Sequence, residues 1–268
     1  MNRALFRAML KQHSKKIAKL STGIILYEGL LTWVYPVISE NPAVTQIAES
    51  IPSTVKTVFG VSEDARMDTF EAFISGQFFA RIWVMLMALY NVETTNELLA
   101  KLVDDGSLAF LLSTPVPREE IISTQILLLL IANALLVSAT LMGLYGGAYQ
   151  SGITIDHWRY FRFGILGFAF YSFIGAYSLF FSSWLKEGEN ALALASGLTL
   201  AFYALDVAGG LSDKLSWARR LSLFRFYQPQ EVLEGTVDPA ASILGLTAGT
   251  VILFNLGIRI FAEKDLAI

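Results

Sequence analysis

The chain has 268 residues and a formal net charge of −3, and it is 54% hydrophobic but only 16% charged. Soluble domains carry roughly 25% charged residues, so much of this surface is not expected to face water. The acidic balance gives no electrostatic basis for binding nucleic acid. Cysteine is absent and only two histidines occur, which excludes disulfides and leaves almost nothing for histidine- or thiolate-based metal sites and catalysis.

The first eighteen residues predict a basic amphipathic helix that lies at an anionic membrane surface. Apolar residues recur at helical spacing, and basic residues occupy most of the other positions. The apolar set is Leu5, Phe6, Met9, Leu10 and Ile17, and the basic set is Arg3, Arg7, Lys11, Lys15, Lys16 and Lys19. A cleaved signal peptide is disfavoured, because the basic region is too long and no small-residue cleavage site follows.

Six apolar segments are long enough to cross a bilayer, which takes about 20 residues in a helix. They are residues 20–39, 71–92, 126–148, 158–183, 190–211 and 241–262. Because backbone in lipid must satisfy its own hydrogen bonds, each is expected to be helical. The sequence therefore predicts an all-α membrane protein with one transmembrane domain over residues 1–268.

Lysine and arginine bias sets the expected orientation. With the N-terminus inside, the inner segments hold eleven basic residues and the outer segments eight, so the total alone decides little. Six of the eleven precede the first span, and these favour a cytoplasmic N-terminus. An even number of spans then places both termini in the cytoplasm.

The segment between the second and third spans predicts a short helix outside the membrane. Thr94 and Glu97 have capping-box spacing, and Gly106 stands where a helix would end. Leu98, Leu99, Leu102 and Val103 give this helix one apolar face. Such a face either packs on the protein itself or binds a partner, and the pattern favours neither.

A motif follows this helix. Gly106-Ser107-Leu108 precedes Leu111-Leu112-Ser113-Thr114-Pro115-Val116-Pro117-Arg118, which leads into the third span. The run resembles the permease subunits of type-two ABC exporters, and the resemblance extends to the six spans, the N-terminal amphipathic helix and the charged C-terminal end.

The resemblance implies a coupling helix over Glu93–Asp105 that docks on a separate ATPase. The positions implied are Glu93, Asn96, Glu97, Leu98, Leu99, Lys101, Leu102 and Asp105. It also implies two ATPase subunits per complex, which would hold ATP and magnesium, and a second permease copy or a similar permease in the cell membrane. The chain itself has no phosphate-binding loop, so no bound cofactor is expected on it.

Polar residues inside spans are candidates for a substrate path. Glu28 and Arg81 lie near the middle of the first and second spans, and two readings stay open: a structural ion pair, or groups that line the path. Asn133 is expected to hydrogen-bond between helices, and Asp206 to bond to a loop or to lipid headgroups. Gly143-x-x-x-Gly147 permits close helix approach.

Two functions fit these patterns. The first is the membrane subunit of an ATP-driven exporter that moves a hydrophobic or amphipathic substrate, such as a drug, an antimicrobial peptide or a lipid-like molecule, by alternating access. The second is a non-transporting membrane scaffold or sensor whose inner loop binds a regulator. A neighbouring ATP-binding cassette subunit would discriminate between them.

Overall fold

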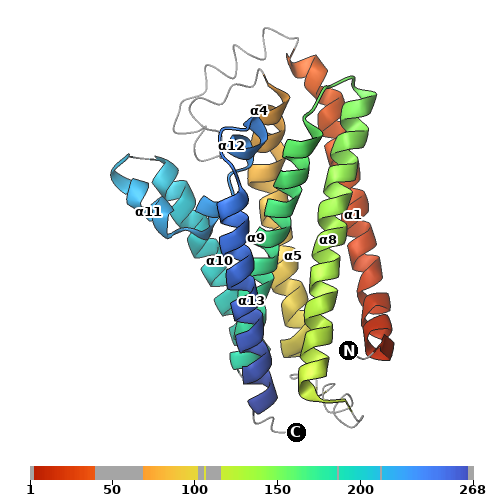
Figure 1. Cartoon of the computed structure of the whole chain (residues 1–268), viewed down its shortest axis with the longest axis vertical. Helices are drawn as coiled ribbons and strands as arrows, with labels where there is room; N and C mark the ends of the chain where they lie inside the picture. Colours follow the sequence, from red (N-terminus) through yellow and green to blue (C-terminus); the bar gives the residue numbers. More distant parts are fainter. Residues whose placement is uncertain are drawn as a thin grey trace.

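A computed structural model describes residues 3–39, 69–101, 106, 116–185, 187–211 and 213–264, and the helices of these ranges form a bundle (Figure 1). Six helices in the described ranges are long and apolar enough to cross a membrane, which confirms the predicted all-α membrane fold. The N-terminal end of the first helix and the C-terminal end of the last lie at the same end of the bundle.

Each predicted span lies within one of the long helical segments. They are α1 (Arg3–Ser39), the second span built from α4 (Phe70–Ile74), η1 (Ser75–Trp83), α5 (Val84–Thr95) and η2 (Asn96–Ala100), then α8 (Arg118–Gln150), α9 (His157–Trp184), α10 (Gly188–Leu211) and α13 (Ala240–Glu263). Short elements join the last two: η3 (Asp213–Leu215), α11 (Ser216–Leu221), η4 (Leu223–Phe226) and α12 (Pro229–Glu234).

The expected surface helix over residues 1–18 is not a separate element. Residues 3–39 form one helix of 37 residues, about 55 Å long at 1.5 Å per residue. No glycine or proline interrupts it before Gly23. The apolar face of its basic end packs on the protein, because Met9 lies in one buried cluster with Leu98, Leu99 and Ile122. Contact of this end with lipid headgroups stays a prediction.

The predicted start of a separate coupling helix at Thr94 is also wrong. Thr94 is a buried residue inside α5, and η2 continues the second span without a break as far as Ala100. Residues 75–83 and 96–100 are π-helical, a wide-turn geometry that is often found at functional sites. Leu102, Val103 and Asp105 lie outside the described residues.

Two glycines of α8 allow it to pack closely against α1. Gly143 and Gly147 of α8 face α1, where a side chain at 143 would meet Glu28 and Ile25, and one at 147 would meet Thr32. The predicted close approach therefore occurs between helices of one chain. Where α13 packs on α9, the side chain of Phe173 lies against Gly249 and that of Leu179 lies against Gly257.

The core is aromatic and is built on α9. Phe163, Phe170 and Tyr171 are buried there and contact Trp83 of η1 or Tyr227 of the connection between α10 and α13. Tyr227 donates a hydrogen bond from its hydroxyl to the carbonyl of Phe79 at 3.3 Å. The apolar connection after α10 thus inserts part of its length among the protein's own helices.

Two expected polar contacts are confirmed. Asn91 and Asn133 exchange side-chain hydrogen bonds of 3.0 and 2.8 Å, which tie α5 to α8. Asp206 of α10 accepts a bond from Arg219 of α11 at 3.3 Å, so its carboxylate is held by the connection between α10 and α13.

Candidate functional site

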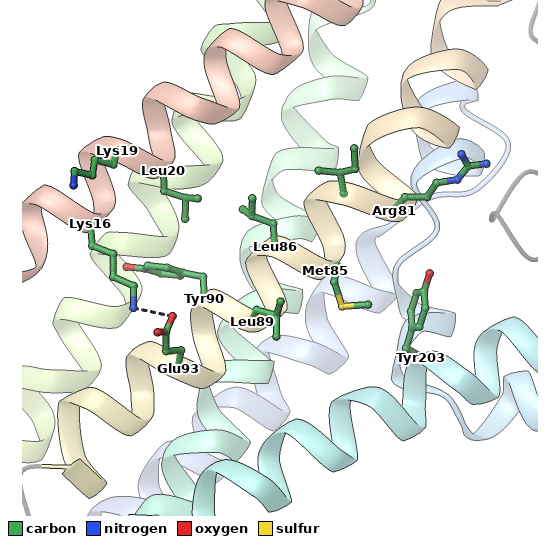
Figure 2. Close-up of a pocket in the computed structure, with 11 residues that line it drawn as sticks. Lys16, Lys19, Leu20, Arg81, Met85, Leu86, Leu89, Tyr90, Glu93 and Tyr203 are labelled. Carbon is green, nitrogen blue, oxygen red and sulfur yellow. Dashed lines mark hydrogen bonds and ion pairs between the residues drawn. The ribbon is translucent and has the colours of Figure 1, made fainter. Parts of the chain in front are cut away.

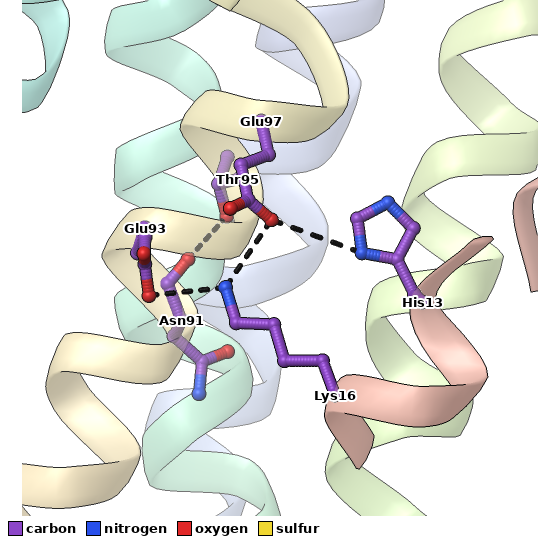
Figure 3. Close-up of polar contacts among 6 residues, drawn as sticks. All are labelled: His13, Lys16, Asn91, Glu93, Thr95 and Glu97. Atoms are coloured by element: carbon purple, nitrogen blue, oxygen red, sulfur yellow. Dashed lines mark hydrogen bonds and ion pairs between the residues drawn. The ribbon is translucent and has the colours of Figure 1, made fainter.

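A polar cluster joins α1 to the end of the second span (Figure 3). The Nζ of Lys16 lies 3.0 Å from a carboxylate oxygen of Glu93 and 3.2 Å from one of Glu97. His13, which is buried, places its Nδ1 3.8 Å from the same oxygen of Glu97. Glu93 and Glu97 lie one helical turn apart, so they share a face and can hold one lysine between them.

The apolar part of the expected docking helix is not available at its surface. Leu98 and Leu99 are 1% and 0% exposed and pack in the cluster that contains Met9. Glu93 and Lys101 are exposed, whereas Asn96 and Glu97 are half-buried. Of the two alternatives for the apolar stripe, these two leucines follow the first and pack on the protein itself. Any partner that binds the described part of this segment would meet polar side chains.

Sequence reasoning missed His13 and Lys16 as members of this cluster. A signal was present, because Glu93 and Glu97 are spaced i,i+4 at the end of one span and the basic end of another span had to lie nearby. What the sequence could not supply was the face of the N-terminal helix that turns toward them.

The cluster leads to a testable prediction. Lys16→Glu would bring three carboxylates together, and we expect it to destabilise the protein by roughly 1–2 kcal/mol. The effect is limited because Lys16 and the two glutamates are only partly shielded from solvent. The measurement is thermal unfolding in detergent. Adding Glu97→Lys should restore more than half of the loss, and Lys15→Glu, on an exposed position of the same helix, should change little. A double variant no more stable than Lys16→Glu would contradict the contact.

A groove of about 900 Å³ opens between α1, the second span and α10 (Figure 2). Its lining combines charged groups with an apolar wall: Lys16, Lys19, Arg81 and Glu93, with Leu20, Ile82, Met85, Leu86, Leu89, Tyr90 and Tyr203. Figure 2 shows Lys16 and Lys19 at one end and Arg81 with Tyr203 at the other, and Met85, Leu86 and Leu89 lie between them.

A smaller cavity of about 160 Å³ adjoins the groove between the second span and α10. Met85, Leu89 and Tyr203 line both spaces. The rest of the lining is largely apolar and includes Val92, Leu200 and Phe224. The charged groove therefore has a hydrophobic side chamber.

Glu28 and Arg81 are not brought together. Glu28 is completely buried where α1 meets α8, and neither of its carboxylate oxygens has a hydrogen-bond partner among the described residues. Arg81 lies in η1 and lines the groove. The structure thus separates the two candidates: Arg81 belongs to the groove, and Glu28 belongs to the packed α1–α8 contact.

In the described ranges, no group of three or more histidine, aspartate or glutamate side chains is arranged to hold a metal ion. The site is an amphipathic groove, and at one end of it ion pairs of Lys16 with Glu93 and Glu97 join α1 to the second span.

Comparison with known protein families places most of the chain in a described family. A family model described as ABC-2 family transporter protein matches residues 29–266, which is most of the chain. No curated protein sequence matches it.

Proposed function

Because the chain belongs to the ABC-2 transporter family, we propose that it is the permease subunit of an ATP-driven exporter in the cell membrane, with both termini in the cytoplasm. It is a multi-pass membrane protein and a transport component. The observation that carries the proposal is the family match over residues 29–266, together with a sequence that holds no phosphate-binding loop. Energy from ATP then has to come from another chain.

The proposed complex contains two ATPase subunits and two permeases, either two copies of this chain or one copy and a similar permease. Alternating access moves a hydrophobic or amphipathic substrate outward. The residues after Thr95 are the proposed contact with the ATPase, and among those described Lys101 is exposed and Asn96 and Glu97 are half-buried. Since Lys16 bonds Glu93 and Glu97, the same contact would reach α1.

Co-purification tests this proposal. The tagged chain is solubilised from its native membranes, and an ATP-binding cassette subunit should be retained, detected by mass spectrometry and by ATPase activity. Lys101→Glu should reduce the retained ATPase at least about tenfold, because like charges brought together at an interface cost several kcal/mol.

Arg225→Glu is the matched control, since Arg225 is exposed in η4, in the connection between α10 and α13, and it should retain the ATPase fully. If the unmodified chain retains no ATPase, the exporter proposal fails and the scaffold function is favoured instead.

A further inference from the structure

We propose that the groove is a binding site for an anionic amphiphile, specifically an anionic phospholipid-like molecule from the surrounding bilayer. The inference rests on the proposed function where it names this molecule as the class of substrate, although binding itself can be measured without transport. It follows from the placement of charge along the groove and from the apolar chamber beside it.

One end of the groove is lined by two cations, Lys16 and Lys19, and Lys16 is held by Glu93 and by Glu97, which lies outside the lining. Glu93 is the carboxylate in the lining, and it is bonded to Lys16 at 3.0 Å. Lys19 is exposed, lines the groove and has no ion pair within the described part of the chain. Basic residues at a membrane surface attract anionic lipid headgroups, so this end of the groove is suited to receive one.

Arg81 supplies a second cationic position deeper in the membrane. It lies twelve residues before Glu93, which is roughly 18 Å along the helix. The inner half of the hydrocarbon core is about 15 Å thick, so Arg81 lies close to the midplane if Glu93 is at the inner headgroup level. An arginine at that depth is costly unless it faces a cavity or a path for charged groups, and Arg81 does face the groove.

The apolar features fit the rest of such a molecule. Between the two cationic positions the wall is formed by Met85, Leu86 and Leu89, and the cavity of about 160 Å³ opens beside them. An acyl chain can lie on this wall or enter the chamber while the headgroup is held by Lys19 or Arg81. A cationic drug would instead meet Lys19 at one end of the groove and Arg81 at the other.

The absence of cysteine allows a direct test. Leu89→Cys, at a groove position 58% exposed, is labelled with a bimane fluorophore in phosphatidylcholine vesicles. Phosphatidylglycerol or phosphatidylcholine with a spin label on the acyl chain is then added as quencher. The control is Leu135→Cys on α8, 47% exposed. The Asn91–Asn133 bonds place Leu89 and Leu135 at similar depth, since each lies two residues from its asparagine.

Stronger quenching by phosphatidylglycerol at Leu89 and equal quenching by both lipids at Leu135 is the expected result. Lys19→Gln and Arg81→Gln should each weaken the apparent affinity for phosphatidylglycerol about fivefold, which corresponds to one basic contact with an anionic lipid. Arg81→Lys should keep most of the affinity, and Lys15→Gln, outside the groove, should leave it unchanged. Thermal unfolding of each variant shows whether it is folded.

Two outcomes would overturn the inference. One is equal quenching by the two lipids at Leu89 in the unmodified background. The other is ready formation of disulfide-linked dimers by Leu89→Cys with no quenching by either lipid, which would mean that a second copy covers the groove. Neither outcome affects retention of an ATPase by the tagged chain, so failure of the lipid site and failure of the exporter proposal remain distinguishable.

Discussion

Gly147→Val is expected to destabilise the bundle by about 3 kcal/mol, the upper part of the range for overpacked cores. A Cβ atom at position 147 would lie 2.8 Å from the Cβ of Thr32 and still closer to its hydroxyl oxygen. Thr32 is fully buried in α1, so neither helix can yield without opening the contact that also encloses Glu28. Thermal unfolding of the purified chain in detergent measures the loss.

The neighbouring glycine provides the control. No atom lies within 4 Å of a Cβ placed on Gly146, so Gly146→Ala should leave stability unchanged or raise it slightly. The smaller substitution Gly147→Ala should also lower stability, and adding Thr32→Ala should recover part of that lost stability. The reason is that the hydroxyl oxygen of Thr32 is the atom nearest to the new Cβ. Strictly additive losses in that double variant would show that the two side chains do not meet.

Trp83→Ala is expected to cost about 3–5 kcal/mol, the usual range for removing a buried large aromatic side chain. Trp83 is 1% exposed, and its ring centroid lies 4.9 Å from that of Tyr171, 5.4 Å from that of Phe79 and 5.9 Å from that of Phe163. It also contacts Tyr227, so its loss should loosen the connection between α10 and α13.

Two measurements separate these effects. Unfolding in detergent reports the lost packing, and tryptic cleavage at Arg219 or Arg220 in intact vesicles reports the loosened connection. Trp33→Ala serves as the control, since Trp33 is 69% exposed on α1, and it should change neither measurement. Unchanged cleavage in a destabilised Trp83→Ala protein would mean that the connection is held without this residue.

The spans could be predicted because the bilayer fixes both their length and their backbone conformation. The fourth span, expected over residues 158–183, is His157–Trp184 in the structure. The pairing of Asn91 with Asn133 shows why a polar residue in a span is informative, since in lipid it needs a partner on another helix.

The start of the first span and the end of the second were mispredicted for one shared reason. Amphipathic spacing shows which face of a segment is apolar but not what covers that face. Met9 and Leu98 cover each other in the same cluster, so two segments that each predicted a surface helix are instead extensions of the first two spans. The capping-box pattern at Thr94 and Glu97 does not cap a helix here, because the helix continues through both residues.

The groove could not be predicted because it depends on how distant segments face one another. Lys19, Arg81 and Tyr203 come from three different spans. The π-helical turns of η1 change the angle at which side chains leave the helix, and no residue pattern in 75–83 announces them. The mid-span position of Arg81 could be predicted from the sequence, whereas the apolar wall of the groove formed by Met85, Leu86 and Leu89 could not.

The unbroken course of α1 has a mechanical consequence. The glycine contact at Thr32 and the charged contact at Lys16 lie sixteen residues apart, roughly 24 Å along one rod. The first contact is closely packed against α8, and the second joins α1 to Glu93 and Glu97 of the second span. A sideways push on the end of the second span would therefore be passed to α1 at Lys16, and if α1 tilted about the contact at Thr32, its C-terminal end at Ser39 would move in the opposite direction.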